Sequence, residues 1–174
     1  MYSDECSVSV VSALTRTYAP RGCTPVITTS TEINLRLYMA SAVSAQGQLR
    51  YRMRHHPFDS QAIIEYLEYL LESFKRKLLL IWDGASIHDS ETVRKYLATK
   101  KQKELCLVRQ PYYAPELNAD EQVWTYLKQH KLKNTCNPTT KELKTKITAV
   151  METLKKQPQM IRNFFLHPSL GYYN

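Results

Sequence analysis

The sequence has few of the features that mark flexible, secreted or membrane-spanning proteins. Glycine occurs only 4 times in 174 residues and hydrophobic residues make up 43%, which excludes a disordered or low-complexity chain. No apolar run approaches the roughly 18 residues that a membrane-spanning helix needs. The first residues lack the basic and apolar segments of a signal peptide. We therefore expect a globular cytoplasmic protein with no membrane segment.

Cysteine is also scarce, with 4 residues at Cys6, Cys23, Cys106 and Cys136. No two of them have the two-residue spacing that is typical of zinc knuckles and thiol redox motifs. We therefore expect reduced thiols, as in other intracellular proteins.

Negative charge is in deficit, because 24 Lys and Arg face 16 Asp and Glu, for a net charge of +8. This balance favours a polyanionic partner, with nucleic acid as the first candidate, although an ordinary basic protein fits the charge alone equally well. The length suits the core of one domain rather than two. We predict a single domain over residues 1–174.

Hydrophobic patterning predicts an α/β fold. Apolar and polar residues alternate over residues 33–43 and 49–54 around Gly47, which favours a β-hairpin. Apolar runs predict strands at 78–82, buried on both faces, and at 105–108. Spacing and capping residues predict helices over residues 60 to about 74, from 90 onward, 118 to about 131, 140 to about 156 and 160–166. This order predicts a mixed β-sheet flanked by α-helices.

Four carboxylates stand where predicted elements begin or end, and three of them, Asp4, Asp83 and Glu121, lie on separate elements. Asp83 directly follows a predicted buried strand, and a carboxylate at such a strand end is common in α/β active sites. Asp120 and Glu121 fall in the first turn of a helix that Asn118 is expected to cap, where negative charge suits the helix dipole. Asp4 precedes the first extended segment.

Three carboxylates on separate elements of a basic domain suit divalent cations. Mg²⁺ prefers oxygen ligands and keeps several waters, so a few carboxylates and a phosphate suffice. Two such ions can activate the attacking oxygen and stabilise the leaving oxygen of a phosphoryl displacement. Each carboxylate taken alone fits a helix cap or an ion-pair partner equally well.

Basic side chains near these positions are candidates for nucleic-acid binding. Arg50, Arg52 and Arg54 share one face of a predicted strand, where a phosphate-facing strip competes with an ordinary solvated face. Lys128 lies on the same side of its predicted helix as Glu121.

Four motifs occur in a fixed order along the chain. Residues 4–6 read DEC and residues 16–25 read RTYAPRGCTP. Residues 82–88 read WDGASIH, and residues 112–124 read YYAPELNADEQVW. They resemble the patterns D-E-S, R-T-W-A-P-R-G-x-T-P, WD-N/G-A-x-x-H and Y-S-P-E-L-N-P-x-E-x-x-W of mariner-superfamily (Tc/mariner) DDE transposases, most closely the bacterial insertion-sequence branch. The likeness extends through nearly the whole chain.

The resemblance implies a ribonuclease H-like fold and cut-and-paste DNA transposition with two Mg²⁺ or Mn²⁺ ions per site. It makes Asp4, Asp83 and Glu121 the catalytic and metal-binding residues. In that family water attacks at the transposon end, and the freed 3′-hydroxyl then attacks target DNA, usually at a TA dinucleotide. We therefore expect a homodimer that binds transposon ends and target DNA, associated with the bacterial nucleoid.

The resemblance also assigns smaller roles. His88 lies beside the site in the family pattern, where a contact with DNA or metal competes with a cap or core role. Glu5 and Glu116 lie next to expected ligands and are second-choice carboxylates. Trp124 is expected to be a core anchor rather than a base-stacking residue.

Two departures from the family pattern leave other readings open. Only three residues precede Asp4, so we expect a truncated first strand. We also expect the N-terminal helix-turn-helix region of the family to be absent, either because the chain is a fragment or because a split reading frame places that region on a separate upstream chain. Besides an active catalytic domain, the sequence fits a silent remnant that binds DNA or a transposase partner. It also fits a Holliday-junction or RNA–DNA hybrid nuclease, although the P-E-L-N context weighs against that reading.

Overall fold

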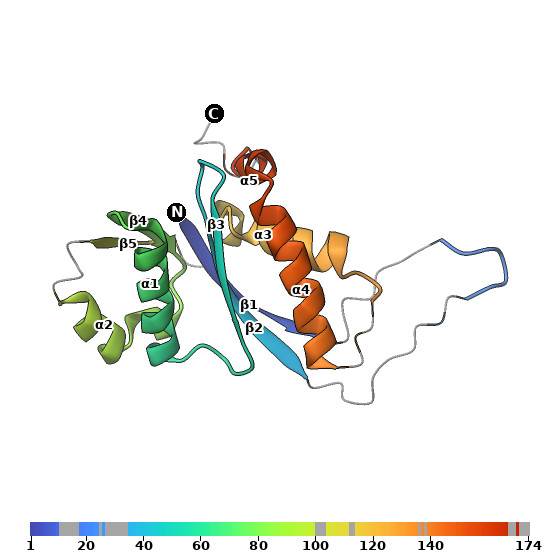
Figure 1. Ribbon diagram of the computed structural model, residues 1–174, viewed down its shortest axis with the longest axis horizontal. Helices are drawn as coiled ribbons and strands as arrows, with labels where there is room; N and C mark the ends of the chain where they lie inside the picture. The colour runs from blue at the N-terminus through green and yellow to red at the C-terminus, as the bar shows by residue number, and fades with distance from the viewer. Residues whose placement is uncertain are drawn as a thin grey trace.

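The computed structural model describes residues 1–10, 18–24, 26, 35–99, 104–111, 114–135, 137, 139–166 and 170. In this part of the chain, five strands form one sheet in the order β3-β2-β1-β4-β5 (Figure 1). β1, β2 and β3 are antiparallel, whereas β4 and β5 run parallel to β1. The strands are β1 (Tyr2–Ser9), β2 (Arg36–Val43), β3 (Leu49–Arg54), β4 (Leu78–Trp82) and β5 (Leu105–Arg109).

Helices cover both faces of this sheet, as predicted. Figure 1 shows α1 and α2 on one side of β1–β3 and α3, α4 and α5 on the other. Each side has its own apolar cluster, with Leu67 and Leu80 in one and Leu127 and Ile147 in the other. The helices are α1 (Ser60–Phe74), η1 (Ser86–Asp89), α2 (Glu91–Leu97), η3 (Pro115–Leu117), α3 (Glu121–Thr125), η4 (Tyr126–Lys131), α4 (Thr140–Lys155) and α5 (Pro158–Phe164). Within the described ranges, no helix combines the length and the apolar character required to cross a bilayer.

The first strand differs from the expectation. Asp4 does not precede the first extended segment but lies inside β1, where it pairs with Ser41 of β2. On the other side, the N-terminal ammonium of Met1 donates to the Leu79 carbonyl over 2.6 Å, and Tyr2 pairs with Ile81 of β4. The few residues before Asp4 are held because strands on both sides bond to them.

The prediction that β4 is buried on both faces was wrong. Leu78, Leu80 and Trp82 are buried beneath α1 and α2, but Leu79 is 51% exposed on the opposite face. Val108 on the neighbouring β5 is 42% exposed. A continuous apolar run does not distinguish a strand covered on one face from a strand covered on both, because the covering elements come from elsewhere in the chain.

The helix predicted from residue 118 begins later and changes type. Asn118 does not cap it; its side-chain oxygen accepts from the Asp120 amide over 3.0 Å, and α3 begins at Glu121. After Thr125 the helix continues to Lys131 as the π-helix η4. The Leu132 amide donates to the carbonyl of Leu127, five residues back. Side-chain periodicity over so few residues does not reveal such a change of pitch.

Gly47 provides a test of the packing between the hairpin and α5. Its φ is +85°, and a Cβ at this position would lie 2.4 Å from the Pro158 carbonyl oxygen. We expect Gly47→Ala to lower the free energy of unfolding by about 2–4 kcal/mol, because backbone strain and a steric clash add. Gly22→Ala is the control, since its φ is +87° but nothing lies within 4 Å of its Cβ. Equal losses in chemical denaturation would contradict the role of Pro158.

Candidate active site

One cavity collects the three predicted carboxylates. Asp4 of β1, Asp83 after β4 and Glu121 at the start of α3 line a cavity of about 420 Å³. The rest of its wall comes from the segments that follow β4 and β5 and from the segment before α3. The structure thus places Asp4, Asp83 and Glu121 around one space, although they are far apart in sequence.

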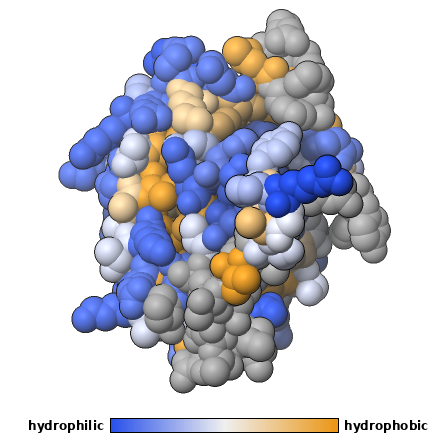
Figure 2. All heavy atoms as spheres, turned by 90° about the vertical axis from the view of Figure 1, so that its right-hand side faces the viewer, coloured by the Kyte–Doolittle hydropathy of each residue, from blue (hydrophilic) through white to orange (hydrophobic). Residues whose placement is uncertain are grey.

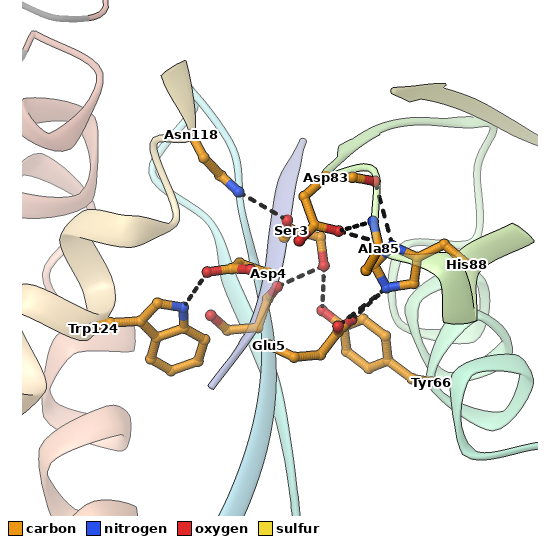
Figure 3. Close-up of polar contacts among 10 residues, drawn as sticks. Ser3, Asp4, Glu5, Tyr66, Asp83, Ala85, His88, Asn118 and Trp124 are labelled. Carbon is orange, nitrogen blue, oxygen red and sulfur yellow. Dashed lines mark hydrogen bonds and ion pairs between the residues drawn. The ribbon is translucent and has the colours of Figure 1, made fainter. Parts of the chain in front are cut away.

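Asp4 is the most buried of the three. Its carboxylate is 9% exposed, and its Oδ2 accepts a hydrogen bond from the Trp124 indole Nε1 over 2.8 Å (Figure 3). Burial raises the pKa of Asp4 to about 7, the charge of Glu121 adds to this effect, and the Trp124 hydrogen bond opposes it. Trp124 is buried in the core as predicted, and it also orients this carboxylate.

Asp83 is held at one of its two oxygens. Asp83 Oδ1 accepts from the Ala85 amide over 3.1 Å and lies 3.0 Å from His88 Nδ1. The hydrogen bond from His88 lowers the pKa of Asp83, burial opposes this, and the Ala85 amide adds to the lowering. Asp83 is therefore a carboxylate with a fixed orientation and a full negative charge at neutral pH.

His88 lies between two carboxylates. Its ring is 6% exposed and stacks on Trp82 with 3.8 Å between ring centroids. Nε2 lies 3.1 Å from both carboxylate oxygens of Glu5, while Nδ1 faces Asp83. Burial lowers the pKa of His88, but the hydrogen bonds and charges of Asp83 and Glu5 outweigh it and raise the pKa to about 9. His88 is therefore a buried imidazole whose nitrogens both face carboxylates, and its contact with DNA or metal stays a prediction.

Asp120, which was predicted to lie in the first turn of a helix, is a buried carboxyl directly before α3. Its side chain is 0% exposed, Oδ2 accepts from Ser41 Oγ over 2.6 Å, and Oδ1 has no partner among the described residues. Burial raises the pKa of Asp120 well above its ordinary value; the Ser41 hydrogen bond opposes this, and the charges of Asp4 and Glu121 add to it. Its spacing of three and four positions before Val123 and Trp124 is the signal that predicts an inward position.

A polar network fixes the backbone next to Asp4. The Asn118 amide donates to the Ser3 carbonyl over 3.1 Å, and Ser3 Oγ donates to the Ser41 carbonyl over 2.7 Å (Figure 3). These bonds tie β1 to β2 and to the segment that leads into α3. Glu116, a second-choice carboxylate, is exposed on η3 and does not line the cavity.

The three predicted arginines of β3 lie outside the cavity and pack on aromatic side chains of α1 and of the segment before it. Their guanidinium groups lie over aromatic rings, at 4.8 Å for Arg50 on Phe74, 4.1 Å for Arg52 on Tyr69 and 5.4 Å for Arg54 on Phe58. None of the three lines the carboxylate cavity. Cation–π stacking gives this strip a packing role that the strand pattern alone does not reveal.

Lys128 lies closer to the acidic residues. It is half-buried on η4, and its positive charge acts to lower the pKa of the Cys6 thiol on β1. Burial raises the pKa of Cys6 to about 12, whereas Lys128 opposes this rise and Asp4, Asp120 and Glu121 reinforce it. Cys6, Cys23 and Cys106 are free thiols, and Cys136 lies outside the described residues. Among the residues described, no group of three His, Cys, Asp or Glu side chains is arranged to hold a metal ion.

The fold and the cavity agree with a known class of proteins. A family model described as DDE superfamily endonuclease matches residues 1–144. The chain belongs to this family, which confirms the predicted DDE membership. No curated protein matches it in sequence.

The solved structures that resemble the chain include several of the Mos1 transposase. The pre-cleavage Mos1 transpososome aligns with a TM-score of 0.70 at 11% identity, over 98% of this chain and 54% of that chain. The Mos1 paired-end complex with the left transposon end gives 0.68 at 11% identity, with the same coverage. The catalytic domain of Mos1 mariner transposase aligns with a TM-score of 0.61 at 12% identity, over 98% of this chain and 80% of that chain. The predicted ribonuclease H-like fold is confirmed, and the chain spans about half the length of the Mos1 chains in these complexes.

Proposed function

We propose that the chain is the catalytic domain of a DNA transposase of the Tc/mariner superfamily. It cleaves DNA strands in a metal-dependent reaction and transfers the freed 3′ end to target DNA. The convergence of Asp4, Asp83 and Glu121 on one cavity carries this proposal. Membership of the DDE endonuclease family and the likeness to Mos1 transposase support it.

The oxygen donors that line the cavity suit Mg²⁺ or Mn²⁺ in their chemistry, although within the described residues they are not gathered into a metal-binding group. The three carboxylates offer only oxygen ligands, which these hard cations prefer. Burial, followed by the charge of Glu121, raises the pKa of Asp4, and a bound cation would favour its ionised form. Two solved Mos1 paired-end complexes are described as containing Mn and Mg. Asp4, Asp83 and Glu121 would hold two such ions, which supply activation of the attacking oxygen and stabilisation of the leaving oxygen.

The chain's own residues prepare this site. Trp124 and the Asn118–Ser3 contact fix Asp4, and the Ala85 amide fixes Asp83 at the end of β4. Glu121 sits at the N-terminal turn of α3, so its orientation follows from the packing of that helix. A DNA strand is held by basic side chains, and Lys128, whose charge acts on Cys6 of β1, is one candidate.

Metal binding is expected to weaken as the pH falls through about 7, because the pKa of Asp4 is raised to about 7. Below this value a proton on Asp4 competes with the cation, since metal ligands must be deprotonated. Above it the carboxylate is free to bind. Calorimetric titration with Mn²⁺ between pH 5.5 and 8 measures the effect, and an affinity that does not change over this range would contradict the assignment of Asp4.

A nicking assay tests the proposed function. Supercoiled plasmid is incubated with the protein and Mg²⁺ or Mn²⁺, with a chelator as the control and Asp83→Ala as the inactive variant. Nicking that requires metal and is lost in a folded Asp83→Ala protein supports the proposal. DNA binding without nicking would favour the silent remnant. The silent-remnant alternative was based on an expected truncation of the first strand. In the structure, β1 includes Asp4.

DNA binding is expected to fall steeply with salt. Hydrophilic residues occupy much of the face seen in Figure 2, between hydrophobic patches. The helix α4 carries the exposed lysines Lys141, Lys144, Lys146 and Lys155. Contacts made mainly to phosphates release counterions, so a protein with about 6 such contacts loses roughly 10³-fold in affinity between 50 and 200 mM salt. Fluorescence anisotropy with a labelled duplex measures this slope, and a flat dependence would contradict backbone binding.

The remaining features of the proposal come from the family resemblance. They are a homodimer working on paired transposon ends, insertion at TA, and action on the bacterial nucleoid in the cytoplasm. Two Mos1 complexes are described as a paired-end complex and a transpososome, which supports DNA ends as the partner. Sedimentation with and without duplex DNA measures the oligomeric state.

A further inference from the structure

The contacts of His88 extend beyond what the proposed reaction requires of the three carboxylates. Consecutive side chains of β1 point to opposite faces of the sheet, so Asp4 faces Trp124 while Glu5 faces His88 (Figure 3). His88 in turn contacts Asp83. One imidazole therefore connects the strand that carries the first acidic residue to the second acidic residue.

The geometry holds this imidazole in a single orientation. Trp82 covers the ring with 3.8 Å between centroids, and the ring is 6% exposed. Nε2 is equally distant, at 3.1 Å, from both oxygens of Glu5. A charge-assisted contact to two oxygens at once fixes both the plane of the ring and its position. Nδ1 is thereby directed at Asp83.

Asp83 depends on this contact because little else restrains it. Its side chain is 46% exposed, and its other side-chain contact is the Ala85 amide. Both contacts are made at Oδ1. A carboxylate held at one oxygen presents the other in a fixed direction, and groups that hold a metal-binding carboxylate in this way change metal affinity by about 10–100-fold when removed.

We propose that Glu5 and His88 are positioning residues for Asp83: Glu5 fixes the imidazole ring of His88, and His88 fixes Asp83 Oδ1 so that Oδ2 faces the divalent cation. This inference rests on the proposed function, because it assigns a cation to the cavity. Neither residue is a metal ligand in it. His88 acts through Asp83, and Glu5 acts through His88.

Two substitutions of His88 separate this role from simple core packing. In His88→Asn the amide nitrogen replaces Nδ1 and still reaches toward Asp83, whereas in His88→Gln it replaces Nε2 and reaches toward Glu5. Mn²⁺ affinity is measured by calorimetry at pH 7.5 on the full chain with duplex DNA bound. We expect His88→Gln to lose about 10–100-fold in affinity and His88→Asn clearly less. His55→Gln, on an exposed histidine after β3, is the control and should bind as the wild type does.

Glu5 is tested in the same titration. Glu5→Gln keeps an acceptor for Nε2 but removes the charge, so we expect a smaller loss of Mn²⁺ affinity than in His88→Gln. In the His88→Asn background, which no longer reaches Glu5, Glu5→Gln should have no further effect. Circular dichroism and thermal unfolding establish that each variant is folded. If His88→Gln fails to fold, Glu5→Gln and its double variant still test the proposal.

The outcomes separate the two proposals. Wild-type affinity in His88→Gln and Glu5→Gln, together with loss of binding in Asp83→Ala, would overturn the positioning role and leave the proposed function standing. Equal losses in His88→Asn and His88→Gln would also overturn it, because packing alone would then explain them. No Mn²⁺ binding by the wild type, even with DNA, would overturn the proposed function and this inference together.

Discussion

Asp83→Asn is expected to reduce DNA cleavage by at least about 10³-fold while leaving DNA affinity unchanged or higher. A metal-binding carboxylate supports several kcal/mol of charge stabilisation in the transition state, and each 1.4 kcal/mol is about tenfold in rate. Asn keeps the shape of the side chain and an oxygen that accepts from the Ala85 amide. Binding does not weaken, because the substitution removes a negative charge next to phosphate.

Plasmid nicking and fluorescence anisotropy, measured on the same samples, test this prediction. The matched control is Asp89→Asn in η1, whose carboxylate pairs with Arg109 and does not line the cavity. The control should cleave DNA within a few-fold of the wild-type rate. Retained cleavage in Asp83→Asn, or weaker DNA binding with the fold intact, would argue against a metal site at Asp83.

Substitutions of Trp124 are expected to affect both the stability of the core and the orientation of Asp4 in the site. It is 3% exposed within the core cluster of α3 and α4, and its indole Nε1 donates to Asp4. Trp124→Ala should lower the free energy of unfolding by about 3–5 kcal/mol, since it leaves a cavity. This is a large fraction of the roughly 5–15 kcal/mol that stabilises a typical domain.

Trp124→Phe separates packing from the hydrogen bond. Phe keeps most of the apolar volume but leaves Asp4 Oδ2 without its donor, so we expect a smaller loss of stability and a loss of cleavage of about 10–100-fold. Denaturant titration and the nicking assay measure the two effects. A Trp124→Phe protein with wild-type cleavage would show that the indole contributes only to packing.

Much of the fold could be predicted from the sequence because it depends on local patterns. Asp59 caps α1, Ser90 caps α2 and Thr139 caps α4, each by accepting the amide hydrogen bond expected of a helix cap. The hairpin around Gly47 and the strands β4 and β5 also lie where alternation and apolar runs predict them. These elements are specified by residues close to one another in the chain.

The elements that were predicted incorrectly depend on distant partners. Asp4 lies inside a strand because β2 and β4 bond to both edges of β1, and no residue near Asp4 encodes those neighbours. Leu79 is exposed because the helices over β4 cover only its other face. Asp120 is buried where the residue before α3 meets β2, and its Oδ2 accepts a hydrogen bond from Ser41 of that strand.

Most strands and helices and the three candidate carboxylates could be predicted from the sequence, because residue type, spacing and capping are local properties. Their arrangement in space depends on tertiary contacts. The tertiary structure placed Asp4, Asp83 and Glu121 around one cavity, aimed Trp124 at Asp4 and put His88 between Glu5 and Asp83. These contacts join side chains from β1, β4, η1 and α3, and their directions follow from the alternation of β1 and the packing of the helices on the sheet.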